Sequence, residues 1–202
     1  GCSNGTNNRG IYAGGETAVY ALTNVIDYIT ISTLGNAADF GDLTLGRARG
    51  IAGMSNGTSN KGVFGGGWVY NVGYFNILAY VTISTLGNAV DFGDLLFESI
   101  YGSACSNGTN NRGVYAIGYV GGGTNILEYI TININGNAID FGDLTVAKTG
   151  LAVCSNGVND RGVFSGGSGG GNVMDYINIA TTGNAARFGE LSVITDDGTA
   201  TS

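Results

Sequence analysis

Residues 53–67 read GMSNGTSNKGVFGGG and residues 76–95 read NILAYVTISTLGNAVDFGDL, and these two segments decide the fold because both recur. The first returns at residues 1–15, 104–118 and 153–167, and the second at residues 24–43, 125–144 and 172–191. The spacing is 52, 51 and 49 residues, counted between Asn4, Asn56, Asn107 and Asn156. Such a period is typical of repeat architectures. We divide the chain, as one domain, into repeat units 1–50, 51–102, 103–151 and 152–202.

Each unit carries the signals of four short strands and no helical period. In the second unit we expect strands at residues 51–55, 62–64, 77–83 and 89–95, which alternate apolar and polar residues and are rich in β-branched and aromatic side chains. Glycine pairs and Gly-Asn mark the turns, and the Asn-Gly at residues 4–5, 56–57, 107–108 and 156–157 is a hairpin signal. Four antiparallel strands in about 50 residues, repeated, predict an all-β fold, a β-propeller of four blades. A β-solenoid is the alternative.

The units resemble the kelch repeat of β-propellers. A glycine doublet follows a short apolar strand, as in VFGG at residues 63–66, an aromatic follows an acidic residue at Asp27-Tyr28, and a basic residue such as Arg49 or Lys148 precedes the next unit. The Trp of the fourth kelch strand is replaced by Phe40, Phe92, Phe141 and Phe188. The resemblance covers the whole chain and implies kelch-like four-stranded blades.

The sequence motifs of the units, GVF followed by IDYITI, GNA and DFGDL, also resemble repeats of bacteriophage tail-fibre and virion proteins. That resemblance implies an extracellular location on a virion. Four blades are the small end of the propeller range. We expect the ring either to close by residues 191–199 joining the first blade next to Cys2, or to be part of a larger propeller or array. A first residue that is Gly and not Met fits a processed chain or a segment of a longer one.

Composition excludes several classes of function. The chain has no His and no Pro, and 8 Lys and Arg against 15 Asp and Glu give a net charge of −7. Without His there is no imidazole for a catalytic triad or a copper site, so a kelch-type copper oxidase is excluded. An acidic chain is a poor partner for nucleic acid. No apolar run is long enough to cross a bilayer. We therefore expect no cofactor, no metal, no nucleic acid and no membrane insertion. We also expect no enzyme, because no unique acid/base pair stands out, with a glycan-degrading lyase or hydrolase as the alternative.

The repeated charged positions point to structural roles. The acids Asp39 and Asp42 recur in the next two units and become Arg187 and Glu190 in the fourth, whereas a catalytic pair is normally unique. We expect their carboxylates to accept backbone N–H groups or to pair with the next blade, with calcium binding as the alternative. A basic residue also recurs before the second strand, at Arg9, Lys61, Arg112 and Arg161. It is expected to pair within its own blade with Asp27, Glu128 or Asp175.

The three cysteines occupy one repeated position. Cys2, Cys105 and Cys154 are equivalent to Met54 of the second unit. A position that accepts Cys or Met is a soft apolar filler, so we expect neither disulfides nor zinc.

The loops between the second and third strands differ most between units. They read GGETAVYALTN, GGGWVYNVGYFN, IGYVGGGTN and SGGSGGGN, and in a propeller they share a face with the connections between blades at residues 47–50 and 97–101 and at Lys148. Variable, aromatic-rich loops on a repeated scaffold are typical of binding sites. The candidate ligand-binding residues are Tyr20, Trp68, Tyr70, Tyr74, Phe75 and Tyr119.

The sequence therefore predicts a non-catalytic adhesin that recognises a cell-surface glycan or protein through these loops, as in host attachment. The alternative is a structural module, such as a capsid decoration, fibre spacer or filament subunit. Its loops would then contact other virion subunits or copies of the same chain.

Overall fold

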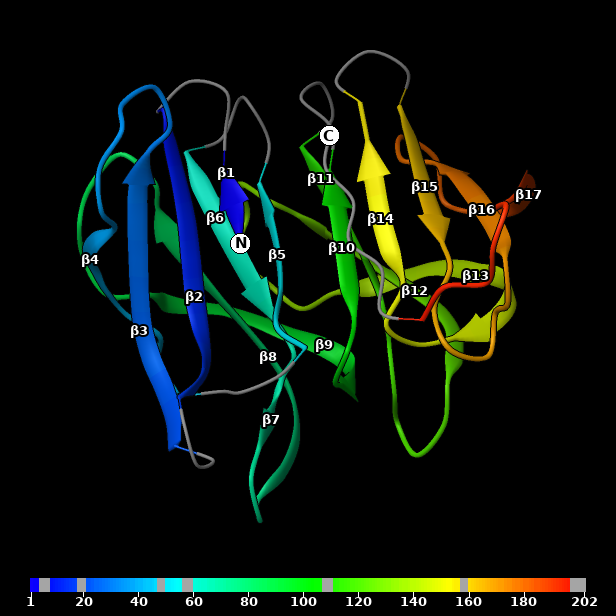
Figure 1. The fold of residues 1–202 in the computed structure, drawn as a ribbon, viewed down its shortest axis with the longest axis horizontal. Coiled ribbons are helices and arrows are strands. Elements are labelled where there is room, and N and C mark those ends of the chain that lie inside the picture. The colour runs from blue at the N-terminus through cyan, green and yellow to red at the C-terminus, as the bar shows by residue number, and fades with distance from the viewer. Residues whose placement is uncertain are drawn as a thin grey trace.

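The computed structural model describes residues 1–3, 8–17, 21–46, 50–55, 60–106, 111–156 and 160–196, which form four antiparallel sheets (Figure 1). The first sheet contains β1 (Cys2–Ser3), β2 (Arg9–Thr17), β3 (Ala21–Thr30) and β4 (Ala38–Asp42). The second contains β5 (Ala52–Ser55), β6 (Lys61–Gly65), β8 (Gly73–Thr82) and β9 (Val90–Ser99), with β7 (Trp68–Val69) paired to the start of β8. The third contains β10 (Ser103–Ser106), β11 (Arg112–Ala116), β12 (Thr124–Thr131) and β13 (Ile139–Lys148). The fourth contains β14 (Ala152–Ser155), β15 (Arg161–Ser165), β16 (Val173–Asn178) and β17 (Ala186–Glu190).

These sheets confirm the predicted all-β chain of four four-stranded repeats, an architecture consistent with propeller blades. Strand pairing is antiparallel throughout the second sheet, unlike the parallel pairing of solenoid coils. In the second unit, β8 and β9 extend well beyond the predicted ends. The strand β8 starts at Gly73 because its first residues pair with β7 in a hairpin, and β9 continues to Ser99, which pairs with Phe75.

The hydrophobic core is divided into three clusters, one between each pair of successive sheets. Phe40 and Ile83 belong to the cluster between the first and second sheets, Phe92 and Ile132 to the next, and Phe141 to the third. All five side chains are buried. Since each repeat buries its apolar face only against a neighbour, the units depend on one another for stability.

In the second, third and fourth units, the GNA turn is hydrogen-bonded to the DFGD strand of the unit before it. The amides of Gly87 and Ala89 donate to the carbonyl oxygens of Phe40 and Asp42, at 2.9 and 2.7 Å. The amide of Asp42 in turn donates to Asn88 Oδ1 at 3.0 Å. The same three bonds recur between the second and third sheets and between the third and fourth, with Gly136, Asn137, Ala138, Gly183, Asn184 and Ala185 in the turns.

A glycine makes this contact possible. Gly41 has a φ of 147°, and a Cβ on it would lie 2.5 Å from the carbonyl oxygen of Gly87. Such a distance is a clash with main chain that cannot move aside without breaking the turn. The repeated FG of the DFGD motif therefore follows from the packing of one unit on the next.

The repeated basic residues do not pair with acids of their own blade, so that prediction is wrong. The Arg9 guanidinium lies 4.9 Å from the centre of the Tyr28 ring, and its Nη1 donates to the carbonyl oxygen of Ile83 in the next sheet at 2.8 Å. Arg112 repeats both contacts with Tyr129 and Ile179. A planar cation can stack on an aromatic face and still donate from its edge, so these residues join neighbouring units.

The position shared by cysteine and methionine is a packing site, as predicted. The sulfur atoms of Cys2, Met54 and Cys105 lie against Gly62, Gly113 and Gly162 of the following sheet, where a Cβ would collide with them. The three cysteines are free. Burial raises the pKa of the Cys105 thiol to about 12, with the Cys154 thiol adding to the effect.

The last described residues of the chain pack on the fourth unit, whereas the sequence predicted that they would join the first. The outer strands of the first and fourth sheets, such as β4 and β17, lie at opposite ends of the long axis of the molecule, whereas their inner strands β1 and β14 line one cavity together with β5 and β10 (Figure 1). The expected closing segment begins at Leu191, but the carbonyl oxygen of Thr195 accepts a hydrogen bond from Gly167 of the fourth unit itself, at 2.8 Å. The described part of this segment therefore packs on its own unit, and residues 197–199 lie outside the described residues.

Candidate functional site

An aromatic pocket lies where the second and third repeats meet. The loop after β6 turns at Gly66 and Gly67, and β7 then pairs with the start of β8, so that Trp68 lies opposite Tyr74. The tip of this hairpin is closed by a hydrogen bond from the amide of Val72 to the carbonyl oxygen of Val69, at 3.1 Å. The hairpin holds both aromatic side chains at a fixed spacing.

The other walls come from the connection between the two blades and from the loop of the third repeat. Ile100 and Tyr119 form an antiparallel bridge, in which the Tyr119 amide donates to the Ile100 carbonyl oxygen at 2.8 Å. The cavity has a volume of about 250 Å³ and is lined by Trp68, Tyr74, Ile100, Tyr101 and Tyr119. These lining side chains are uncharged, so the pocket favours a neutral ligand or a neutral part of one.

Edge-to-face contacts orient the rings. The centroids of Tyr74 and Tyr119 are 6.0 Å apart at an interplanar angle of 77°, and those of Trp68 and Tyr70 are 5.7 Å apart at 88°. Perpendicular rings at these distances attract one another because the positive edge of one faces the negative face of the other. The pocket is therefore held in shape by its own side chains.

Tyr101 has a φ of 56°, a backbone conformation that is uncommon for a bulky residue. Its neighbourhood is rigid: the buried Ser99 accepts a hydrogen bond from the amide of Gly118 on its Oγ at 3.1 Å, and its carbonyl oxygen accepts one from Gly67 at 2.7 Å. Backbone strain of this kind clusters at binding and catalytic sites. Tyr101 is 38% exposed at the pocket.

The structure brings together half of the predicted site residues. Trp68, Tyr74 and Tyr119 line the pocket, and Tyr70 flanks it through its contact with Trp68. Phe75 is half-buried and pairs with Ser99 in the sheet. Tyr20 lies outside the described residues. The prediction did not include Ile100 and Tyr101, although both belong to the connection at residues 97–101 that was expected on the same face.

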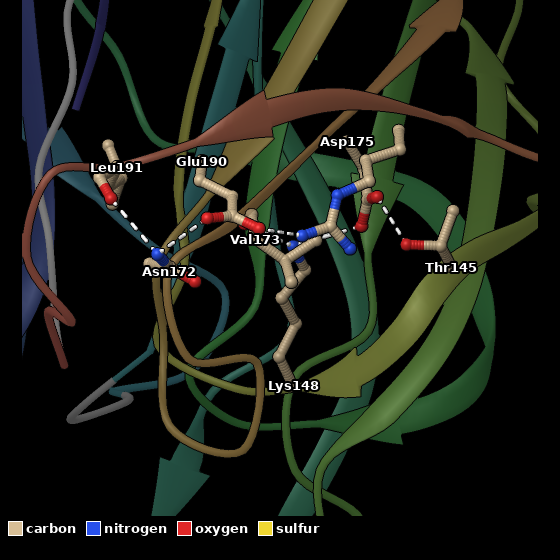
Figure 2. Close-up of polar contacts among 8 residues, drawn as sticks. Thr145, Lys148, Asn172, Val173, Asp175, Glu190 and Leu191 are labelled. Carbon is tan, nitrogen blue, oxygen red and sulfur yellow. Dashed lines mark hydrogen bonds and ion pairs between the residues drawn. The ribbon is translucent and has the colours of Figure 1, made fainter.

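Lys148 was expected on this loop face, and the structure buries it instead. Its Nζ lies 3.0 Å from Asp175 Oδ2 of the next sheet and donates to the carbonyl oxygen of Val173 at 3.2 Å, and both charged side chains are fully buried. The Thr145 hydroxyl donates to the other carboxylate oxygen of Asp175 (Figure 2). The buried ammonium of Lys148 and the buried carboxylate of Asp175 are paired with each other, so we assign the cluster a structural role.

Glu128 is a buried acidic side chain whose pKa is raised. It is fully buried, and its Oε2 accepts the amide of Leu96 at 2.9 Å, whereas its Oε1 has no hydrogen-bond partner. Burial raises the pKa of Glu128 to about 7, hydrogen bonds from the amides of Leu96 and Phe97 oppose the rise, and the charge of Asp140 adds to it. Because no part of the carboxyl reaches the surface, a substrate has no access to it.

The second acid of the DFGD motif, at Asp42, Asp94 and Asp143, contacts the next unit through its main chain. The amide and carbonyl of Asp42 carry the bonds to the next unit described above, where the sequence predicted a role for the carboxylates. Within the described ranges, no group of three or more His, Cys, Asp or Glu side chains is placed to hold a metal ion.

A scan against known protein families finds no matching family, and a search of the curated proteins finds no similar sequence. Across the described segments, no helix is long and apolar enough to cross a membrane.

Proposed function

We propose that the chain is a non-catalytic binding module of a virion, and that its aromatic pocket binds a sugar ring of a cell-surface glycan. The supporting observation is the 250 Å³ cavity, which three separate segments of two repeats build from four aromatic side chains and Ile100. The C–H faces of a sugar carry slight positive charge and pack on the negative faces of aromatic rings, and tyrosine hydroxyls supply hydrogen bonds at the edges. The acidic chain fits a neutral glycan better than a polyanionic one.

Binding can be measured with a glycan array and by adsorption to host cells. The variants Trp68→Ala and Tyr119→Ala remove two walls of the pocket and should abolish binding without unfolding the chain. Tyr12→Ala is the matched control, since Tyr12 is 53% exposed on β2 of the first repeat and belongs to no part of this pocket. Unchanged adsorption by the two pocket variants would contradict the proposal.

A second candidate is a structural module whose loops contact other virion subunits. It is favoured by exposed apolar side chains beside the pocket: Tyr70, Val72 and Val120 are 49%, 71% and 43% exposed. A protein partner would cover this rim and the pocket together. Protection of Val72 and its neighbours from hydroxyl-radical labelling in assembled particles, with no glycan binding by the free chain, would support the second candidate over the first.

A further inference from the structure

The three interfaces between successive repeats are formed by the same contacts. The outer face of the first unit and the outer face of the fourth unit each present one of the two surfaces that form such an interface, and neither surface is covered. Each interface joins a DFGD strand of one unit to a GNA turn of the next by the three hydrogen bonds described above. A further unit placed before the first or after the fourth would meet the same surfaces. Each residue on the outer faces of the first and fourth units can therefore be compared with its equivalent at a covered interface.

The fourth unit leaves the DFGD half of the interface uncovered. Phe188 is 50% exposed, although its equivalents Phe40, Phe92 and Phe141 are each 2% exposed. A Cβ on Gly189 would meet only Met174, at 3.5 Å, whereas a Cβ on the equivalent Gly142 would lie 2.6 Å from the main chain of Gly183. Arg187 is paired with Glu190, so this end carries no unpaired charge there that would resist docking.

The first unit leaves the GNA half of the interface uncovered. Ile31 is 57% exposed, although its equivalents Ile83, Ile132 and Ile179 are fully buried. Ala37 is also exposed, whereas the equivalent Ala89 and Ala138 are buried. A large apolar side chain that is buried in three of four repeats and exposed in the fourth points to a missing partner.

A third set of contacts is interrupted at the same two ends. Cys105 and its equivalents lie against a glycine of the following unit, but Cys154 of the fourth unit is not among the near neighbours of Gly10 in the first. Arg9 and Arg112 each donate to a carbonyl of the following unit, and the equivalent Arg161 is exposed and lies over its own Tyr176 ring. The units are joined at three places and leave these two ends apart (Figure 1).

We propose that the fourth unit of one copy docks on the first unit of a second copy and continues the array head to tail. The amides of Gly35 and Ala37 would donate to the carbonyl oxygens of Phe188 and Glu190 of the other copy, and Asn36 would accept from the Glu190 amide. The occupant is a second copy because its first unit presents the complement of this face, continuous with three existing interfaces. The outer strands of the chain's own first unit, which carry the matching face, lie at the other end of the molecule (Figure 1). Such a heterologous contact forms rings or open filaments.

This proposal does not depend on the aromatic pocket, which lies between the second and third units. It is tested by sedimentation velocity of the whole chain over a range of concentrations. We expect the wild-type chain to form species larger than a monomer as the concentration rises. A chain that stays monomeric at every concentration, through closure on itself or lack of affinity, would overturn the proposal.

Two variants each block one of the two docking surfaces, one on the fourth unit and one on the first. Gly189→Ala places a Cβ where the turn of the second copy would lie, yet finds room in the single chain. Ile31→Lys puts a charge into the core of the interface from a site exposed in the single chain. Each variant alone should weaken association at least tenfold. The matched control Gly122→Ala, at a glycine with open space around it, should associate like the wild type.

An equal mixture of the two blocked variants gives the sharpest result. The intact fourth unit of the Ile31→Lys chain can dock on the intact first unit of the Gly189→Ala chain, and both remaining ends are blocked. The mixture should therefore form dimers and stop there. A mixture that remains monomeric, or variants that assemble like the wild type, would overturn the proposal.

Discussion

Replacing Asp175 with Asn should destabilise the chain by about 3–5 kcal/mol, because it leaves the Lys148 ammonium buried without an anion. Both side chains are fully buried, and the ammonium nitrogen lies 3.0 Å from the carboxylate oxygen. The amide of Asn has nearly the same shape as the carboxylate and can still accept from Thr145. The change therefore removes the charge and little else.

The magnitude follows from the distance and the burial. At 3.0 Å and an effective dielectric constant of about 20, two unit charges attract by about 5–6 kcal/mol. The Asp175→Asn chain loses this attraction and keeps part of the cost of burying Lys148, whose only other bond in this cluster is to the carbonyl of Val173. For a chain of this length the loss corresponds to a fall in Tm of roughly 6–20 °C.

Urea unfolding followed by circular dichroism measures the loss. The matched control is Glu190→Gln, which breaks the ion pair with Arg187, whose side chains are 51% and 55% exposed, and should cost less than about 1 kcal/mol. The double variant Lys148→Met with Asp175→Asn removes the buried charge and should regain much of the stability. A cost for Asp175→Asn no larger than that of Glu190→Gln would refute this reasoning.

Three further predictions concern single side chains. Folding raises the pKa of Glu128 from near 4.5 to about 7, so its contribution to the free energy of unfolding should fall by up to about 3 kcal/mol as the pH rises between these values. Urea unfolding at a series of pH values measures this slope, and Glu128→Gln should remove it. Gly142→Ala should lower Tm by several degrees, because its φ is 135° and its Cβ would meet Gly183, whereas Gly189→Ala should leave the Tm of the monomer unchanged. The buried Cys105 thiol should resist maleimide labelling at pH 8 until the chain unfolds, with the labelled site identified by mass spectrometry because Cys2 and Cys154 are only half-buried, and rapid labelling of Cys105 itself in the native chain would contradict its place in the core.

The repeat period and the four strands of each unit could be predicted from sequence, because alternation and turn residues are local signals. The partners of Arg9 could not. Its sequence neighbours suggest an acid of the same blade, but the contact that forms is with the carbonyl of Ile83, and it depends on how two units stack. The same holds for Lys148 and Asp175, which come from successive sheets and meet only after packing.

The candidate site was predicted in part for a related reason. Trp68, Tyr74 and Tyr119 stand in the variable loops, where their composition marks them. Ile100 and Tyr101 stand in a connection between blades, and their place in the pocket depends on the bridge to Tyr119 and on the positive φ of Tyr101. An aromatic residue in such a connection is the signal that could have found Tyr101.

The central claim is that the aromatic pocket binds a sugar, and the chain carries its own reporter for that claim. Its single Trp, Trp68, is a wall of the pocket. Titration with oligosaccharides from the host surface should shift and saturate the Trp68 fluorescence and reduce its quenching by acrylamide, and Tyr119→Ala should weaken this response at least tenfold while Tyr12→Ala leaves it unchanged. A Trp68 signal that stays constant while the same oligosaccharides bind the chain, as measured by calorimetry, would contradict the account.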